Sequence, residues 1–141
     1  MQFNTYLYFN GNCEEAFRFY EQLFGGKIEA MFPHEGSPAA SQVPPEWQKK
    51  ILHARMTIGD AVLMASDAPP GRFQKQQGFS ININLGDAAK AEKIFNSLAK
   101  DATVVTMPFG ETFWAHRFGM LTDRFGIPWM FNVEKAAPAQ A

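Results

Sequence analysis

Residues 3–26 read FNTYLYFNGNCEEAFRFYEQLFGG and carry the signals for a strand, a turn and a helix in that order. Aromatic and β-favouring side chains dominate residues 3–9, which is typical of a β-strand. The Asn-Gly-Asn sequence at 10–12 predicts a turn, because these residues tolerate the backbone angles that turns require. The chain therefore begins with a strand that leads through a short turn into a helix.

The helix in this stretch has a cap, an apolar stripe and a stop signal. Asn12 lies three residues before Glu15, which is the spacing of a capping box. Ala16, Tyr20 and Leu23 recur at helical spacing and predict the buried side of the helix. The two glycines that close the stretch supply the left-handed residue with which many helices end.

The rest of the chain predicts the same order of elements twice. After the first helix, strands are expected at residues 27–32, 51–58 and 61–65. The second half is expected to contain a strand at 80–85, a helix capped by Asp87, and strands at 102–107, 113–122 and 127–133. The pattern predicts an α+β fold of paired βαβββ modules at about 1–67 and 78–134. Together they make one domain, residues 1–134, followed by a flexible tail at 135–141.

Residues 33–50 interrupt the regular pattern. Prolines occupy positions 33, 38, 44 and 45, where they remove backbone donors, and the segment is longer than an ordinary loop. We expect a mobile segment with one short helix at 45–50, since a proline and an acid suit a first helical turn.

Composition excludes several classes of protein. The 141 residues carry a net charge of −1 with pI near 6.3, so no basic field attracts nucleic acid. No apolar run approaches the roughly 20 residues that span a bilayer, and no secretory signal is visible, so the expected location is the cytoplasm. Cys13 is the single cysteine and forms no internal disulfide. Fourteen phenylalanines suggest an aromatic core or cavity and an apolar surface that a homodimer would cover.

Several segments together resemble a known family. These segments are YLYFNGNCEEAFRFY at 6–20, HAR at 53–55, FWAHRFG at 113–119 and DRFGIPW at 123–129. They resemble PhnB-like proteins of the vicinal oxygen chelate superfamily, which also contains glyoxalase I, bleomycin- and fosfomycin-resistance proteins and extradiol dioxygenases. The resemblance spans about residues 3–133. It implies paired βαβββ modules whose curved mixed sheets surround a cup, usually completed in a homodimer.

The resemblance also assigns positions for a metal ion. In metal-dependent members, the first and last strands of each module supply the ligands, and these positions correspond here to Asn4, Met64, Ser80 and Met130. Such ions require imidazole or carboxylate ligands, and none of these four residues provides one. We therefore expect no metal and no other cofactor. The alternative is a displaced site built by His53 and His116.

Polar residues on the first strand of each module are candidates for a ligand site. Strand 80–85 alternates as Ser-Ile-Asn-Ile-Asn-Leu, which gives one apolar and one polar face. The same alternation groups Asn4, Tyr6 and Tyr8 on the earlier strand. Neutral amides and phenols orient a polar ligand rather than transfer protons. From the pattern alone a solvated sheet face is favoured, whereas the resemblance favours a face that lines the cup.

Two histidines lie close to arginines. His53 and Arg55 share a face by strand alternation, and His116 adjoins Arg117. Such pairs act as a general base or hold a carboxylate or phosphate. Alternatively, His53 and Arg55 are edge-strand residues whose hydrogen bonds are made by the backbone or a dimer partner.

Other polar and aromatic residues have simpler interpretations. His34 is expected to be exposed in the proline-rich segment, and Asp123 to close a turn, while Asp67 either turns the chain or faces the cup. Cys13 lies in the first turn of a helix, where a thiolate is favoured, but it has no apparent base. Trp114 and Trp129 are expected to lie in the core or at a dimer contact.

The sequence therefore predicts a small-molecule-binding protein of the PhnB-like type without an assigned reaction. Its ligand is expected to be polar or amphipathic. The expected ligand-binding residues are Asn4, Tyr6, Tyr8, His53, Arg55, Ser80, Asn82, Asn84, His116 and Met130. The alternatives are a lyase, isomerase or antibiotic-resistance enzyme that uses a displaced metal or a His/Arg pair, and a protein that sequesters a drug across a dimer interface. A methyltransferase is not expected, because no glycine-rich turn joins a strand to a helix.

Overall fold

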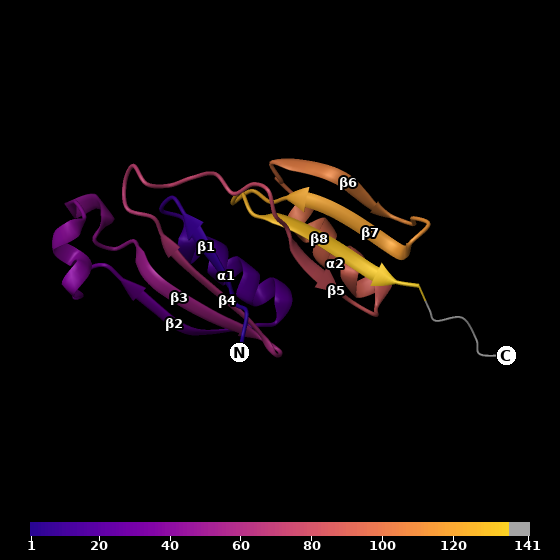
Figure 1. The fold of residues 1–141 in the computed structure, drawn as a ribbon, viewed down its shortest axis with the longest axis horizontal. Coiled ribbons are helices and arrows are strands. Elements are labelled where there is room, and N and C mark those ends of the chain that lie inside the picture. Colours follow the sequence, from indigo (N-terminus) through magenta and orange to yellow (C-terminus); the bar gives the residue numbers. More distant parts are fainter. Residues whose placement is uncertain (136–141) are drawn as a thin grey trace. The chain divides into compact units, whose positions relative to one another are not determined.

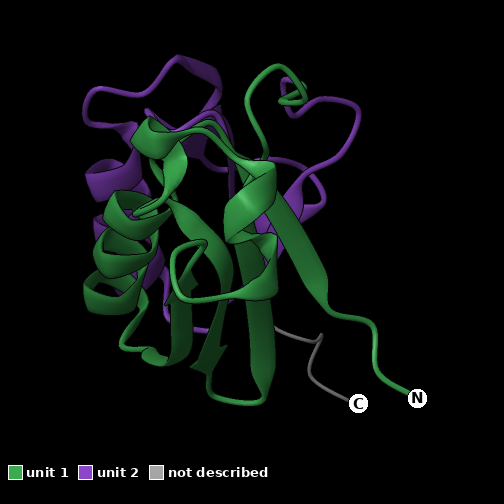
Figure 2. Cartoon of the chain, turned by 90° about the vertical axis from the view of Figure 1, so that its left-hand side faces the viewer, with its two compact units in different colours: residues 1–74 green, residues 75–141 purple. Residues whose placement is uncertain are grey.

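The computed structural model describes residues 1–135 and divides the chain into two compact units (Figure 2). Unit 1 contains residues 1–74 and unit 2 begins at Lys75. Each unit consists of a four-stranded mixed sheet and one α-helix that lies on one face of that sheet (Figure 1). No helix among residues 1–135 is long and apolar enough to cross a membrane. Of the predicted tail at 135–141, all but Lys135 lies outside the described residues.

Unit 1 has its strands in the order β1-β4-β3-β2. The outer strand β1 runs parallel to β4, and the other neighbours are antiparallel. Its elements are β1 (Thr5–Phe9), α1 (Cys13–Phe24), β2 (Lys27–Pro33), the 3₁₀ turns η1 (Pro38–Gln42) and η2 (Pro45–Trp47), β3 (Ile51–Ile58) and β4 (Ala61–Asp67).

Unit 2 repeats this topology, with the strand order β5-β8-β7-β6 and β5 parallel to β8. Its elements are β5 (Ile81–Asn84), α2 (Ala88–Ala99), β6 (Val104–Gly110), β7 (Ala115–Thr122) and β8 (Pro128–Glu134). The predicted α+β fold with two βαβββ repeats is confirmed. The expected strand at 102–107 is displaced to β6, and residues 113 and 114 precede β7 rather than belonging to it.

The core of unit 1 lies between α1 and one face of its sheet. Phe17 and Tyr20 of α1 are fully buried, as are Leu7 and Ala65 in the strands below them. Phe9 meets Phe17 edge to face with ring centroids 6.4 Å apart. Burying such side chains contributes roughly 1.5–3 kcal/mol each. The helical stripe expected from the sequence is therefore the buried face, although Leu23 at its end is only partly covered.

The core of unit 2 depends on one glycine. Phe95 of α2 packs edge to face on Phe131 of β8, with centroids 5.6 Å apart. The same ring covers Gly119 of β7, where an added Cβ would lie 2.7 Å from Phe95 Cε2. A side chain at position 119 would therefore displace the helix from the sheet.

The two helices begin in different ways. Asp87 caps α2 as predicted, because its side chain accepts a hydrogen bond from the Lys90 amide at 3.1 Å. The predicted side-chain cap at Asn12 is wrong, since its side chain makes no capping hydrogen bond. Instead Asp67 Oδ1, at the end of β4, accepts from the Cys13 amide at 3.0 Å. A residue distant in sequence therefore supplies the acceptor that a helix start requires.

The segment at 33–50 is joined to its surroundings by side-chain hydrogen bonds. Gln48 Nε2 donates to the carbonyls of Ala40 and Val43, at 2.7 and 3.0 Å. Trp47 Nε1 donates to the Ala68 carbonyl at 3.1 Å, which links the segment to the chain that follows β4. The predicted short helix is present as the single turn η2. The mobility of the segment stays a prediction.

Candidate functional site

The helix-free face of unit 1 carries a row of predicted site residues. Tyr6 of β1 pairs with Met64 of β4, and Met64 pairs with Arg55 of β3. Residues paired in register project from the same face of a sheet. Leu7 and Ala65, which alternate with this row, are buried on the side of α1. Tyr6, Met64 and Arg55 therefore project from the opposite face, and each is partly exposed.

His53 joins this row through a direct contact with Tyr6. The Tyr6 hydroxyl lies 3.2 Å from His53 Nδ1, and the two rings are nearly parallel with centroids 5.8 Å apart. Burial raises the pKa of Tyr6 above its ordinary value, while a hydrogen bond with Ser66 acts in the opposite direction. The phenol is therefore neutral at physiological pH and acts as a hydrogen-bonding group. The Tyr8 ring lies 5.1 Å from that of Tyr6 and extends the aromatic surface.

The helix-free face of unit 2 has the same geometry with different chemistry. Asn82 of β5 pairs with Met130 of β8, which pairs with Met120 of β7, which pairs with Met107 of β6. This row has the register of the Tyr6–Met64–Arg55 row in unit 1. It carries one amide and a line of thioethers. No charged side chain lies in it.

A second row of unit 2 contains a pair of asparagines. Asn84 pairs with Asn132 of β8, and Asn84 Oδ1 accepts from Asn132 Nδ2 at 3.3 Å and from Asn82 Nδ2 at 3.2 Å. Sequence reasoning missed Asn132 and the methionines at 107 and 120, as well as Ser66 in unit 1. Strand alternation assigns a residue to a face only after the pairing register is known, so only the register reveals these residues.

The remaining predicted residues lie outside the rows on the two helix-free faces. Asn4 and Ser80 precede β1 and β5 instead of lying within them. His116 is exposed near the start of β7, where Arg117 Nη1 lies 3.4 Å from its Nδ1 and donates to its carbonyl at 2.7 Å. His53 and His116 belong to different units. Their joint role, and a ligand role for each predicted residue, stay predictions.

Two buried carboxylates have structural roles. Asp67 Oδ1 accepts from the Gly11 and Cys13 amides, and its Oδ2 accepts from the Ile51 amide at 2.8 Å. Asp67 therefore has a structural role, because its carboxylate joins three segments of unit 1. Asp123 closes its turn as predicted, accepting from the amides of Phe125 and Ile127 at 2.9 and 3.0 Å.

The expected exposure of His34 is wrong, and a thiolate is not favoured at Cys13. His34 is only 3% exposed, because the 33–50 segment folds around it and Nδ1 bonds the Lys50 carbonyl at 2.9 Å. Cys13 is fully buried, and burial together with the nearby Asp67 carboxylate raises the pKa of its thiol far above the ordinary range. A thiol in this environment is inert, so its place in the first helical turn does not make it a nucleophile.

The metal positions implied by the resemblance hold unsuitable ligands. An amide, a hydroxyl and two thioethers supply neither negative charge nor imidazole nitrogen at Asn4, Ser80, Met64 and Met130. Among residues 1–135, no group of three or more His, Cys, Asp or Glu side chains is arranged to hold a metal ion. The residues therefore do not fit the divalent ion of the metal-dependent members.

This donor set leads to a prediction about the purified protein. Elemental analysis is expected to find no stoichiometric Zn, Ni or Fe, and a chelator is expected to leave the melting temperature unchanged. About one bound metal per chain, lost together with thermal stability in His53→Ala or His116→Ala, would show that a displaced site exists.

The chain is similar in sequence and in fold to known proteins. Residues 2–131 match the family described as the Glyoxalase/Bleomycin resistance protein/Dioxygenase superfamily. Protein YjdN of Escherichia coli (strain K12) is 33% identical over 151 residues, which cover 99% of this chain and 100% of that protein. The crystal structure of protein PA1353 from Pseudomonas aeruginosa has 48% identity and a TM-score of 0.87, covering 96% of this chain and 99% of the other.

A second structure extends the comparison to more distant sequences. It is described as a putative 3-demethylubiquinone-9 3-methyltransferase, PhnB protein, from Bacillus cereus, and shares 24% identity with a TM-score of 0.80. It covers 94% of this chain and 99% of the other, and at this identity it shows the fold alone. The match over residues 2–131 and the full-length relative confirm the resemblance. The chain belongs to the Glyoxalase/Bleomycin resistance protein/Dioxygenase superfamily.

Proposed function

We propose that the protein binds a small amphipathic organic molecule on the helix-free face of unit 1, without a metal ion at the four family positions. The observation that carries this proposal is the hydrogen-bonded pair of Tyr6 and His53, at 3.2 Å, beside the Arg55–Met64 row. A phenol and an imidazole orient hydroxyl or carbonyl groups, and a guanidinium favours a partly negative oxygen. The Met64 thioether and the tyrosine rings provide the apolar contact surface that small-molecule sites require.

The uncharged rows on the helix-free face of unit 2 support the same ligand class. The Asn82–Asn84–Asn132 group offers amide donors and acceptors, and the methionine row offers an adaptable apolar surface. Neither face contains a carboxylate in these rows. The proposed ligand is therefore polar or anionic at one end and apolar at the other.

A screen with variants tests this function. A library of small metabolite-like molecules is measured by thermal shift and ligand-observed NMR, and each hit is measured again with His53→Ala and Arg55→Gln. We expect both variants to lower the affinity of the hits about tenfold, because each variant removes a charge-assisted or buried hydrogen bond. The matched control is Arg18→Gln, because Arg18 pairs with Glu14 on the exposed side of α1. Hits that bind both variants as tightly as the control would contradict the proposal.

A catalytic role is the second candidate, and the Tyr6–His53 contact is the observation that favours it. A phenol that is hydrogen-bonded to an imidazole can relay a proton to a bound molecule, as lyases and isomerases require. Mass spectrometry of the hits after incubation with the protein detects such a reaction. Tyr6→Phe is expected to abolish turnover and to retain binding, whereas unchanged turnover in this variant would exclude the relay.

The homodimer expected from the sequence remains part of the proposal, as does the cytoplasmic location. Exposed aromatic side chains of unit 2 support the dimer: Phe113 is 86% and Trp114 48% exposed, and their rings meet edge to face at 4.8 Å. Trp129, in contrast, is a core residue that is 2% exposed. Light scattering is expected to give about twice the 15.8 kDa chain mass, and a monomer at tens of micromolar would contradict the dimer.

Methyl transfer, the activity in the name of the Bacillus cereus protein, is not proposed for this chain. Nucleotide-type methyl donors are held where a glycine-rich turn joins a parallel strand to a helix. The turn between β1 and α1 contains one glycine, Gly11, and the carboxylate of Asp67 accepts a hydrogen bond from its amide at 2.8 Å. The Gly11 amide is therefore already paired within the chain and is not available to a ligand.

A further inference from the structure

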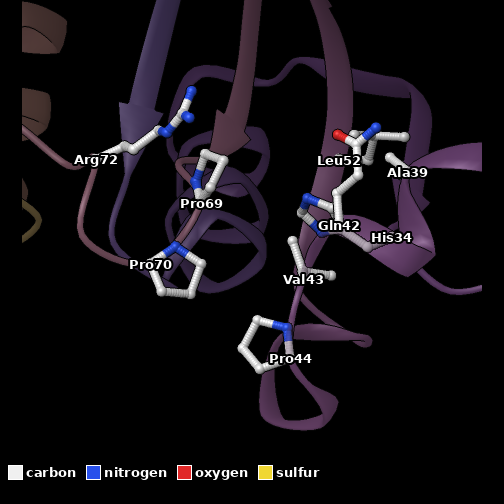
Figure 3. A pocket seen from close by; sticks show the side chains of 9 residues that line it. All are labelled: His34, Ala39, Gln42, Val43, Pro44, Leu52, Pro69, Pro70 and Arg72. Atoms are coloured by element: carbon white, nitrogen blue, oxygen red, sulfur yellow. The ribbon is translucent and has the colours of Figure 1, made fainter.

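Unit 1 contains a pocket at one end of its sheet. The pocket has a volume of about 500 Å³ and opens between the 33–50 segment and the residues that follow β4 (Figure 3). Figure 3 shows Pro69, Pro70 and Arg72 on one side and the residues of the 33–50 segment with Leu52 on the other. The volume is within the range of sites that bind small organic molecules.

The pocket is separate from the helix-free face described above. None of Tyr6, His53 and Arg55 lines it. Leu52, its single lining residue within a strand, alternates with His53 along β3 and therefore projects from the other side of the sheet. A ligand bound in the pocket would use residues that the proposed function does not.

The polar groups of the pocket favour an anion. Within residues 1–135, the side chains of Arg72 and Gln42 take part in no hydrogen bond or ion pair, and no carboxylate lines the pocket. His34 Nδ1 donates to the Lys50 carbonyl at 2.9 Å, so in the singly protonated ring Nε2 is an acceptor and does not contribute to binding a carboxylate. The guanidinium of Arg72 therefore matches the charge and geometry of a single carboxylate, and the Gln42 amide offers a further donor to a ligand in the pocket.

The apolar walls favour a flat ligand. The rings of Pro44, Pro69 and Pro70 face the space together with Val43 and Leu52. Proline rings are rigid and present C–H groups, which pack on the electron-rich face of an aromatic ring at little cost in conformational entropy.

We propose that this pocket is a second ligand site and that it binds a small aromatic monocarboxylate. The carboxylate pairs with the Arg72 guanidinium, and the aromatic ring packs against the prolines. Because the pocket shares no residue with the helix-free face, the site exists whether or not that face binds a ligand.

Phenylacetate and its neutral amide, phenylacetamide, form the test pair, and two-dimensional NMR of the full chain measures their affinities. Phenylacetate is expected to bind with saturable shifts at residues 34–44 and 69–72, about tenfold more tightly than phenylacetamide. Arg72→Gln is expected to remove this preference. Val43→Trp fills the space and is expected to weaken both probes, which shows independently of the charge that they bind in this pocket.

Arg55→Gln is the matched control, since it removes the guanidinium of the helix-free face in the same unit. Phenylacetate binding that survives Arg55→Gln and is lost in Arg72→Gln supports the second site. Binding lost in Arg55→Gln alone would overturn it and assign the carboxylate to the helix-free face. Equal affinity of both probes, or the absence of saturable binding, would also overturn it.

Discussion

Asp67→Ala is expected to lower the free energy of unfolding by about 3–5 kcal/mol, because three N–H donors lose their acceptor at once. The donors are the amides of Gly11, Cys13 and Ile51, at 2.8 to 3.0 Å, and the carboxylate is 2% exposed. Urea denaturation gives the free energy of unfolding. Hydrogen exchange is expected to accelerate in residues 1–74, where these donors lie.

Two further variants define the origin of this effect. Asp67→Asn keeps the shape but replaces one acceptor oxygen with a donor, which would face either the Ile51 amide or the amides at the start of α1. It is therefore expected to destabilise the fold by more than about 1 kcal/mol. Asp60→Ala is the control, because Asp60 is exposed between β3 and β4. Equal stability of Asp67→Ala and Asp60→Ala would show that the three hydrogen bonds of the Asp67 carboxylate do not hold unit 1 together.

Asp123→Ala is expected to have a similar effect on unit 2, about 3–4 kcal/mol. Its Oδ1 accepts from the amides of Phe125 and Ile127, and its Oδ2 accepts from Trp129 Nε1 at 2.8 Å. The residue is 1% exposed, so water does not replace these bonds while the turn stays folded. Urea denaturation measures the loss, and the indole N–H resonance of Trp129 is expected to shift.

Asp87→Ala is the matched control for this carboxylate. It removes an exposed helix cap in the same unit, with one hydrogen bond to the Lys90 amide, and is expected to cost about 1 kcal/mol. If Asp123→Ala were no more destabilising than Asp87→Ala, the buried bonds of Asp123 would contribute little net stability.

The order of the elements was predictable from local signals. Strand alternation, the helical stripe in α1, the glycines after it and the Asp87 cap each depend on residues close together in the sequence. These signals predict the βαβββ order twice, and the structure confirms it. The ends of strands were predicted less well, since pairing with neighbours decides where β6 and β7 begin.

The candidate site was predictable in part. Tyr6, His53 and Arg55 were predicted as ligand-binding residues from alternation and resemblance, and the structure brings them to one face. Ser66 and Asn132 were missed, because a polar residue near the end of a strand is also typical of a solvated sheet.

The sequence by itself determined the fold class and the two repeats, since these depend on residue types and local spacing. Only the tertiary structure decided that Asp67 caps α1, that Cys13 and His34 are buried, and that the 33–50 segment borders a pocket. Each of these features depends on contacts between residues far apart in the chain. Their burial and hydrogen bonds arise only when the sheet and its helix pack together, so no local pattern records them.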